Sequence, residues 1–362
     1  MLASLFSKKP TSYGARIAPA NVELRVGSKE TLLQAALNQD LAFPHDCRAG
    51  GCGACKCRLV KGKVRELTDK SYILSAEELR DNYVLACQSI PQSDIEIDVE
   101  LRDTGTPVQT HQSPGRITRL EPLTHDILHV ALTLDHALPF MPGQYCELSP
   151  KEGSAAGVKR SYSFANVPDA NGTSRNVEFF IRKVPGGRFT EWLFNQARVG
   201  DSLDATAPYG DFVLRESAAQ MLCIAGGSGL APVLSLLQGA LLSLKRPREL
   251  TLVFGARSQQ DLYMLDAIDA LRREWPVRFD FVPILADEPA GSSWQGRRGL
   301  IGDHLAGVLG ESLAAQQAYL CGPPGMIDSC IAVLETAGVR ASDVCFDKFL
   351  DQSHLASTKQ VA

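Results

Sequence analysis

The chain has 362 residues, of which 44% are hydrophobic and 22% are charged, and this length is sufficient for two or three domains with separate cores. Its 37 basic and 41 acidic residues give a net charge of -4, so there is no basic excess to neutralise the phosphates of a nucleic acid. The N-terminus lacks the pattern of a signal peptide, and glycines and a proline interrupt the uncharged run 217–244, which argues against secretion and against a membrane span. The composition therefore predicts a cytoplasmic protein, although the absence of acidic residues before Glu23 leaves a transit-like leader open as an alternative.

Residues 1–101 are predicted to form a mixed α+β domain. A helical stretch covers 30–39, a loop rich in glycine and cysteine follows, and the segment 94–101 alternates aliphatic with acidic residues as a strand does. These acidic residues predict a negative stripe that docks a partner, with an ordinary solvated strand face as the alternative. Residues 102–115 hold two prolines and two glycines without apolar periodicity, so we expect a linker there.

Four of the ten cysteines fall between residues 47 and 57. Cys47, Cys52 and Cys55 have the spacing C-x4-C-x2-C, and with the distant Cys87 they match the ligand pattern of plant-type [2Fe-2S] ferredoxins. The intervening glycines allow the backbone to wrap a cluster and to point N–H groups at its sulfides. A zinc site is the alternative, but zinc commonly uses paired C-x2-C motifs and this loop contains one. We expect Cys57 to be a buried structural thiol.

The rest of the chain predicts two further domains. Residues 116–215 contain short β-rich runs separated by turn signals, which are typical of an antiparallel barrel. In residues 216–362 apolar strands alternate with helical stretches, which is the pattern of an α/β domain with a parallel sheet. The predicted fold is therefore multidomain.

A motif in the predicted barrel points to a flavin. Phe140-Met-Pro-Gly-Gln-Tyr145 followed by Arg160-Ser-Tyr-Ser163 resembles the flavin-binding pattern of the ferredoxin-NADP reductase superfamily. Over nearly the whole chain, the sequence is similar to the reductase components of bacterial multicomponent oxygenases, which carry ferredoxin, FAD and NADH modules in this order. The resemblance implies a β-grasp-like ferredoxin domain, an antiparallel FAD-binding β-barrel and a parallel-sheet NAD-binding domain.

The same resemblance assigns roles to the flavin motif. It implies that Arg160 pairs with a flavin phosphate, that Tyr162 lies against the isoalloxazine ring and that Ser163 hydrogen-bonds near the reactive N5. The segment from Gly187 to Thr190 precedes a helical stretch and would receive the flavin pyrophosphate on backbone N–H groups. We expect FAD, with FMN as the competing cofactor.

Two motifs of the last domain point to a pyridine nucleotide. The first follows an apolar strand, places small residues where a pyrophosphate must approach the backbone, and resembles the superfamily's Gly-Gly-Thr/Ser-Gly-x-Ala-Pro motif. Its members are Gly226, Gly227, Ser228, Gly229 and Pro232. The second motif, Cys321-Gly322-Pro-Pro-Gly-Met326, ends a later strand. By resemblance Cys321 lies near the nicotinamide carbon that gives up hydride, with a buried inert thiol as the alternative.

The C-terminal segment Phe346-Asp347-Lys-Phe349 resembles the family's aromatic-acid-x-aromatic ending. The resemblance implies that Asp347 supports hydride transfer, although relatives usually have Glu at this position. It also implies that Phe349 covers the flavin face until nicotinamide displaces it.

The choice of nucleotide depends on the loop after the second strand of the last domain. This loop offers Arg257 and Ser258 together with the acidic Asp261, whereas a 2′-phosphate requires a cluster of basic and hydroxyl groups. We therefore expect NADH, with NADPH as the alternative.

The three modules together predict conversion between paired and single electrons. NADH gives two electrons at once, an iron–sulfur cluster accepts one, and a flavin can do both. The resemblance makes the acceptor a terminal oxygenase, either a Rieske dioxygenase or a di-iron monooxygenase, or a separate ferredoxin that serves it. Two alternatives stay open: a reductase of the same architecture for a deoxysugar dehydratase or a desaturase, and a redox sensor or electron carrier that does not turn over nicotinamide.

Overall fold

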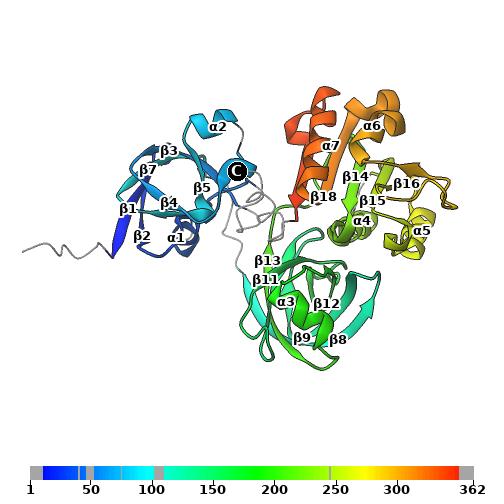
Figure 1. The fold of residues 1–362 in the computed structure, drawn as a ribbon, viewed down its shortest axis with the longest axis horizontal. Helices are drawn as coiled ribbons and strands as arrows, with labels where there is room; N and C mark the ends of the chain where they lie inside the picture. Colours follow the sequence, from blue (N-terminus) through cyan, green and yellow to red (C-terminus); the bar gives the residue numbers. More distant parts are fainter. Residues whose placement is uncertain are drawn as a thin grey trace, which may run out of the picture. The chain divides into compact units, whose positions relative to one another are not determined.

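The computed structural model describes residues 11–39, 41–45, 53–74, 76–101, 110–243 and 246–349. The chain divides into two compact units, Met1–Val108 and Gln109–Ala362, and Figure 1 labels most of their helices and strands. Two predicted cluster ligands, Cys47 and Cys52, lie outside the described residues. Of the helices that the structure describes, none is both long and apolar enough to cross a membrane.

The first unit is built on a five-stranded mixed sheet. Its strands are β1 (Ser12–Ile17), β2 (Val22–Gly27), β3 (Lys56–Lys61), β5 (Tyr83–Leu85) and β7 (Ile95–Asp98), in the order β2-β1-β7-β3-β5. Strands β1 and β2 form an antiparallel hairpin, β7 lies parallel to β1, and β3 is antiparallel to β7 and β5. A separate pair consists of β4 (Val64–Glu66) and β6 (Ser89–Pro91).

Helix α1 (Leu32–Asn38) packs its apolar face into the core of this unit. It begins after Thr31, whose hydroxyl accepts the backbone N–H of Gln34 at 3.2 Å and so satisfies one of the free donors of the helix N-terminus. Leu32 and Leu33 of the helix join the buried side chains of the sheet in one apolar cluster. The helix lies within the predicted range 30–39. The remaining short elements are η1 (Lys70–Tyr72), α2 (Ala76–Arg80) and η2 (Ala86–Gln88).

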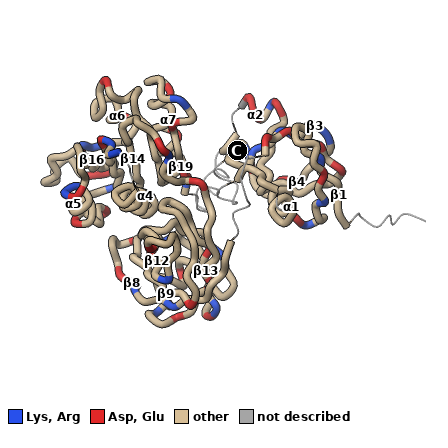
Figure 2. The backbone as a smooth tube through the Cα atoms, turned by 180° about the vertical axis from the view of Figure 1, so that it is seen from behind, with Lys and Arg blue, Asp and Glu red and all other residues tan. Residues whose placement is uncertain are grey.

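The acidic residues of β7 face basic neighbours. Nη2 of Arg58 on β3 lies 2.6 Å from Oδ2 of Asp98, and Nη1 of Arg16 on β1 lies 4.0 Å from Oε2 of Glu96. Figure 2 shows basic and acidic positions side by side around this sheet. These two exposed pairs reduce the negative charge of the predicted stripe at Glu96 and Asp98, which favours the alternative, an ordinary solvated strand face.

The second unit begins with a six-stranded antiparallel sheet. Its strands are β8 (His111–Pro122), β9 (Ile127–Pro139), β10 (Tyr145–Pro150), β11 (Arg160–Ser163), β12 (Thr173–Arg182) and β13 (Ser202–Tyr209), in the order β11-β10-β13-β8-β9-β12. A bridge between Phe164 and Phe179 joins the two ends of this order and closes the sheet into a barrel. Helix α3 (Arg188–Asn195) packs Phe189, Trp192 and Leu193 into the barrel core.

Strand β8 begins inside the predicted linker 102–115. Residues 111–115 pair with β13, and Pro114 stands opposite Asp204. Proline is tolerated in a strand where its missing N–H is not needed by the ladder. Gly115 is needed for packing, since a side chain there would meet Leu134 Cδ2 at 2.7 Å. Turn-forming residues thus occupy a strand because of contacts with strands distant in sequence.

The rest of the second unit is a six-stranded parallel sheet. Its strands are β14 (Gln220–Gly226), β15 (Leu250–Ala256), β16 (Phe279–Leu285), β17 (Arg297–Arg298), β18 (Gln316–Gly322) and β19 (Val344–Lys348), in the order β17-β16-β15-β14-β18-β19. Alternate residues of β14 enter different cores: Cys223 and Ala225 pack with α4 (Leu230–Ser243) and α5 (Leu265–Glu274), whereas Ile224 packs with α6 (Ile301–Leu309) and α7 (Pro324–Thr336). Helices therefore cover both faces of the sheet. The short elements are η3 (Gly227–Gly229), η4 (Gln259–Asp261), η5 (Gly310–Ala315) and η6 (Ala341–Asp343).

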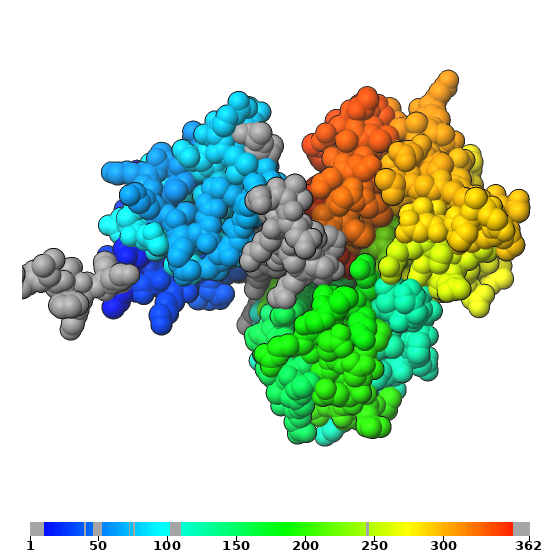
Figure 3. All heavy atoms as spheres, in the orientation of Figure 1, coloured from blue at the N-terminus to red at the C-terminus, as the bar shows by residue number. Residues whose placement is uncertain are grey.

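The barrel and the α/β sheet of the second unit share an interface, and Figure 3 shows the green barrel in contact with the yellow-to-red α/β part. The hydroxyl of Ser235 on α4 donates to the carbonyl of Asn166 at 2.7 Å. Pro142 of the barrel lies so close to Gly239 on α4 that a side chain at Gly239 would meet its Cγ at 2.5 Å. These contacts hold the end of the barrel that carries the flavin motif against α4.

Candidate functional site

The two predicted nucleotide motifs meet at the switch point of the parallel sheet. Strand β14 is the first strand of this sheet in sequence and lies between β15 and β18. Strands β15 to β17 follow on one side of β14, and β18 and β19 follow on the other side. Open α/β sheets bind ligands at the point where the order of the strands reverses in this way. A side chain at Gly226 would meet the sulfur of Met326 at 2.6 Å, and one at Gly229 would overlap the carbonyl of Cys321. Both glycines are therefore required by close contact between the motifs.

Gly227 differs from these two glycines because its φ of +54° lies in the left-handed region, and nothing lies near the position of a side chain. The turn thus combines a backbone that favours glycine with open space on its outer side. Pro232 is buried in the first turn of α4, where a missing N–H costs nothing. This cradle fits a nucleotide pyrophosphate.

Cys321 is fully buried at the end of β18 and stands opposite Asp347 in the register of β18 and β19. Burial raises the pKa of the Cys321 thiol well above its usual range, and the nearby charge of Asp347 raises this pKa further. The sulfur therefore remains a neutral thiol at neutral pH and is unsuited to act as a thiolate nucleophile.

The C-terminal segment ends beside the same motifs. The backbone N–H of Phe349 donates to the carbonyl of Gly322 at 2.8 Å. Its half-buried side chain packs against an apolar cluster that contains Cys321 of the α/β sheet together with Ile127 and Ala165 of the barrel. Phe349 thus lies where the nucleotide motifs meet the barrel.

Tyr263 is a site residue that carries no motif signal. Its hydroxyl donates to the carbonyl of Gly227 at 3.0 Å, and its ring lies edge-on to Phe180 of the barrel at 5.5 Å between centroids. Burial raises its pKa, and the neighbouring Cys321 raises it further. The buried phenol of Tyr263 therefore stabilises the glycine turn through its hydrogen bond to Gly227. Local sequence patterns do not encode this contact.

The first half of the predicted flavin motif leads into β10, which begins at Tyr145, and its second half forms β11, which pairs with β10. Ser163 is 5% exposed and stands opposite Tyr145, while Arg160 is exposed and its guanidinium donates to the carbonyl of Lys159 at 2.8 Å. Tyr162 has its ring centroid 5.1 Å from that of Phe189, and burial raises its pKa.

A pair of stacked rings stands beside this motif. The rings of Tyr145 and Tyr209 stack at 5.4 Å, and Gly210 makes this possible because a side chain there would meet the Tyr145 ring at 2.9 Å. Tyr209 is the last residue of β13, and the stack places it next to the flavin motif. An exposed guanidinium beside aromatic rings fits a phosphate-bearing planar heterocycle.

The turn before α3 leaves backbone N–H groups available to donate hydrogen bonds to a ligand. Gly187 is the N-cap residue of α3, and no side chain caps the helix. The hydroxyl of Thr190 turns inward, where it accepts the backbone N–H of Val184 at 3.0 Å, so it supports the turn rather than presenting itself to a ligand. A helix N-terminus without a side-chain cap leaves N–H groups that fit a pyrophosphate.

In the first unit, Cys55 and Cys87 lie close together. The backbone N–H of Cys87 reaches the Cys55 sulfur at 3.5 Å, and the side-chain amide of Gln88 lies 3.7 Å from the Cys87 sulfur. Donors directed at both sulfurs fit thiolates that share a cluster, because such N–H groups stabilise the charge on sulfur.

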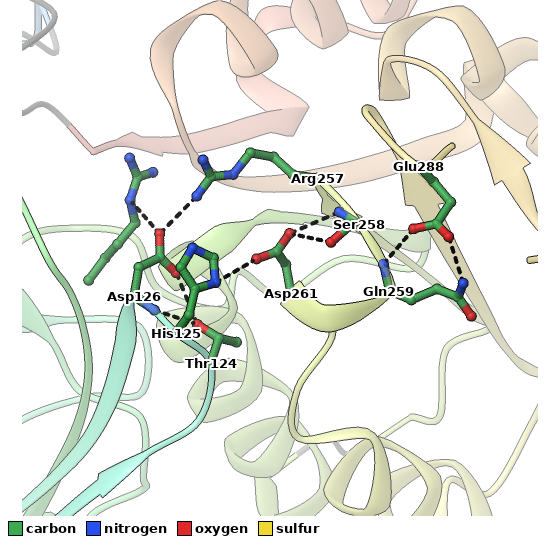
Figure 4. Close-up of polar contacts among 9 residues, drawn as sticks. Thr124, His125, Asp126, Arg257, Ser258, Gln259, Asp261 and Glu288 are labelled. Atoms are coloured by element: carbon green, nitrogen blue, oxygen red, sulfur yellow. Dashed lines mark hydrogen bonds and ion pairs between the residues drawn. The ribbon is translucent and has the colours of Figure 1, made fainter. Parts of the chain in front are cut away.

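The loop after β15 is occupied by ion pairs. Nη2 of Arg257 lies 2.9 Å from Oδ2 of Asp126, and the Ser258 hydroxyl lies 2.9 Å from Oδ2 of Asp261 (Figure 4). Within the part of the chain that the structure describes, one group of three metal-binding side chains is found, formed by His125, Asp126 and Asp261. Because Arg257 pairs with Asp126, this group is better described as an ion-pair network.

Comparison with known proteins identifies all three modules. Residues 15–92 match the 2Fe-2S iron-sulfur cluster binding domain, residues 114–214 the oxidoreductase FAD-binding domain and residues 223–331 the oxidoreductase NAD-binding domain. These matches agree with the cofactor types predicted from the motifs, and the strands described above confirm the predicted fold class.

The relatives cover nearly the whole chain. The xylene/toluene monooxygenase electron transfer component XylA of Pseudomonas putida is 39% identical over 97% of this chain and 97% of its own length. The phenol 2-monooxygenase reductase component DmpP of Pseudomonas sp. (strain CF600) is 34% identical over 93% of this chain and 94% of its own length. Among solved structures, the ferredoxin reductase in carbazole 1,9a-dioxygenase has a TM-score of 0.72 and 31% identity, and covers 94% of this chain and 98% of its own. The chain therefore belongs to the family of iron–sulfur flavoprotein reductases that includes these reductase components of oxygenase systems.

Proposed function

We propose that the protein is a cytoplasmic NADH-dependent reductase that delivers electrons through FAD and a [2Fe-2S] cluster to a terminal oxygenase, directly or through a separate ferredoxin. The observation that carries this proposal is the apolar cluster shared by Cys321, Phe349, Ile127 and Ala165. This cluster places the nucleotide motifs next to the flavin-binding barrel. Hydride transfer from nicotinamide to flavin requires the two rings to lie next to each other.

Each motif residue has a proposed task. The nucleotide is bound by the turn Gly226, Gly227, Ser228 and Gly229 ahead of Pro232, by Gly322 and Met326 of the second motif, and by Arg257. The flavin is bound by Arg160, Tyr162, Ser163, Gly187, Thr190 and Phe349, with Thr190 acting by shaping the turn. The cluster is bound by Cys47, Cys52, Cys55 and Cys87.

The chain's own residues orient these groups. A bound flavin supplies the exchange between two-electron and one-electron transfer. Tyr263 fixes the glycine turn, and the neutral thiol of Cys321 provides an uncharged wall at the place where the nicotinamide ring enters. Asp347, adjacent in register to Cys321, keeps negative charge near this wall, which favours a positively charged oxidised nicotinamide. Phe349 excludes water from the flavin face until the nucleotide arrives.

We further propose three domains, 1–101, 111–215 and 216–362, of which the second begins five residues earlier than the sequence predicts because β8 begins at His111. The matched ranges 15–92, 114–214 and 223–331 support this division.

The names of the relatives favour an oxygenase of aromatic hydrocarbon catabolism as the acceptor. Xylene/toluene, phenol and naphthalene oxygenase systems all appear among them. A non-oxygenase partner and a redox sensor remain the competing functions, and the intact nucleotide motifs argue against the sensor.

The test is steady-state reduction of cytochrome c and ferricyanide by the purified full chain with NADH, together with mass analysis of the released flavin. We expect NADH-dependent reduction of both acceptors and release of FAD. Absence of NADH oxidation would favour the sensor, and release of FMN would contradict the proposed adenine half of the flavin site.

A further inference from the structure

The loop after β15 lies where a nucleotide ribose is recognised. Strand β15 pairs in parallel with β14, and Gly255 stands opposite Gly226 of the glycine turn. In sheets of this kind, side chains beyond the second strand distinguish a ribose hydroxyl from a 2′-phosphate. Arg257 and Ser258 are the groups of this loop with the chemistry to bind a phosphate.

Both groups are already bound to carboxylates, as Figure 4 shows. Arg257 pairs with Asp126 at 2.9 Å. Ser258 directs both its backbone N–H and its hydroxyl at Asp261, each at 2.9 Å. A third carboxylate, Glu288, accepts the backbone N–H of Gln259 at 2.8 Å. The 2′-phosphate of NADPH would therefore approach a loop whose donors are bound to three carboxylates, and these carboxylates repel its negative charge.

Asp126 does not belong to the nucleotide-binding sheet. It comes from the turn before strand β9 of the barrel, where Thr124 donates to its Oδ1 at 3.0 Å. Its backbone carbonyl accepts the N–H of Lys183 at 2.7 Å, and Arg182 Nε lies 3.7 Å from its Oδ2. With its side chain 18% exposed, Asp126 is held from several directions with one oxygen facing Arg257.

We propose that Asp126 is a specificity-determining residue for the nucleotide, an inference that rests on the proposed NADH-dependent function. Asp126 fixes the position of the Arg257 guanidinium and neutralises its positive charge. With the charge of Arg257 paired, the 2′-phosphate of NADPH gains little from the guanidinium, whereas the uncharged ribose hydroxyls of NADH need from Arg257 no more than a hydrogen bond. Selection of the nucleotide by one domain therefore depends on a carboxylate of another. Asp126 is a positioning residue in this scheme, because it acts through Arg257.

The test uses Asp126→Asn, Arg257→Ala and the double variant in the purified, flavin-loaded full chain. Calorimetry gives the Kd of adenosine 2′,5′-diphosphate and of 5′-AMP, which differ by the 2′-phosphate alone. We expect Asp126→Asn to tighten binding of the diphosphate relative to 5′-AMP by about tenfold, since a charge-assisted guanidinium–phosphate pair becomes available. The gain should disappear in the double variant. The ratio of kcat/KM for NADPH over NADH, with ferricyanide as acceptor, should rise in parallel.

The matched control is Glu121→Gln, which removes a carboxylate from the same barrel, 68% exposed and paired with Arg119 instead. It should leave the binding ratio within twofold of wild type. An unchanged ratio in Asp126→Asn, an equal change in Glu121→Gln, or a gain that persists without Arg257 would each overturn the inference. If Asp126→Asn fails to fold, Asp126→Ser removes the same charge and is expected to give the same ratio. A wild-type chain that does not oxidise NADH contradicts the proposed function instead, and the binding ratios still decide the inference.

Discussion

Cys57 is a cysteine close to the predicted cluster that we exclude as a ligand. It lies within β3 opposite Val84, is 1% exposed and belongs to the apolar core of the first unit. We predict that Cys57→Ala retains iron and visible absorption, whereas Cys87→Ser loses both, because the Cys87 sulfur receives a donor from Gln88 and matches the ligand spacing. Iron content and the visible spectrum of the two purified variants give the measurement. Loss of iron in Cys57→Ala with retention in Cys87→Ser would reverse the assignment.

The pair of His129 and Glu178 gives the barrel a dependence on pH. Nε2 of His129 lies 2.7 Å from Oε2 of Glu178, and this hydrogen bond lowers the pKa of Glu178. A carboxylate whose pKa is lowered by folding stabilises the folded state above its unfolded pKa, and this stabilisation is lost as the pH falls through the folded pKa. We predict that Glu178→Gln reduces stability at pH 7 by about 1 kcal/mol or less, because the carboxylate is partly exposed to solvent.

The difference in stability between wild type and Glu178→Gln should shrink at acidic pH, once Glu178 itself is protonated. Thermal unfolding of both chains from pH 7 down to about pH 3 measures this difference. Glu152→Gln, an exposed position of the same barrel, serves as the control and should show no such trend. A difference that stays constant over the whole range would mean that the hydrogen bond, rather than the charge, carries the effect.

At the scale of single residues, the sequence is informative where chemistry demands one residue type. Cysteine is the residue type that supplies thiolates to iron, and few residue types other than glycine let a pyrophosphate approach the backbone. Cys55, Cys87 and Gly226 could therefore be identified as candidates from the spacing of their motifs. Tyr263 and Asp126 could not be, because each acts through a partner more than thirty residues away. Ordinary residue types acquire a role there only through the tertiary fold.

At the scale of elements, apolar runs that alternate with helical stretches predicted the parallel sheet of β14, β15 and β16, and short β-rich runs between turn signals predicted the barrel. The start of β8 was missed because Pro114 and Gly115 are turn formers by local preference. Their strand conformation is imposed by pairing with β13 and by contact with Leu134. Pairing between distant strands thus overrides local propensity at this position.

Two helical glycines allow a matched test of the interface between barrel and α4. A side chain at Gly239 would meet Pro142 Cγ at 2.5 Å, whereas one at Gly307 on α6 would meet nothing within 4 Å. We predict that Gly239→Ala destabilises the chain by about 1–3 kcal/mol through overpacking. Gly307→Ala should instead stabilise it by about 0.5–1 kcal/mol, because alanine restricts the unfolded chain and favours helix. Denaturant unfolding measures both, and stabilisation by Gly239→Ala would show that α4 can move away from Pro142.

At the scale of the whole molecule, the apolar clusters follow the division into two units. One cluster consists of residues 15–101, and the three others consist of residues from 117 onward. One of these three contains both barrel and sheet residues. The barrel and the α/β sheet are therefore expected to unfold together, while the ferredoxin-like unit has a core of its own.

This separation of cores predicts two thermal transitions. Cys87→Ser should lower the transition of the first unit, because a cluster that binds only the folded state stabilises that state, and should leave the other transition in place. Leu252→Ala should do the opposite, since Leu252 is fully buried in the cluster shared by barrel and sheet, and a truncation of this kind costs about 2–5 kcal/mol. Calorimetry of the full chain, with flavin fluorescence on release to mark unfolding of the second unit, distinguishes the two transitions. If either variant shifted both by the same amount, the two units would be coupled in stability, and contacts between them would have to contribute free energy comparable to that of a core.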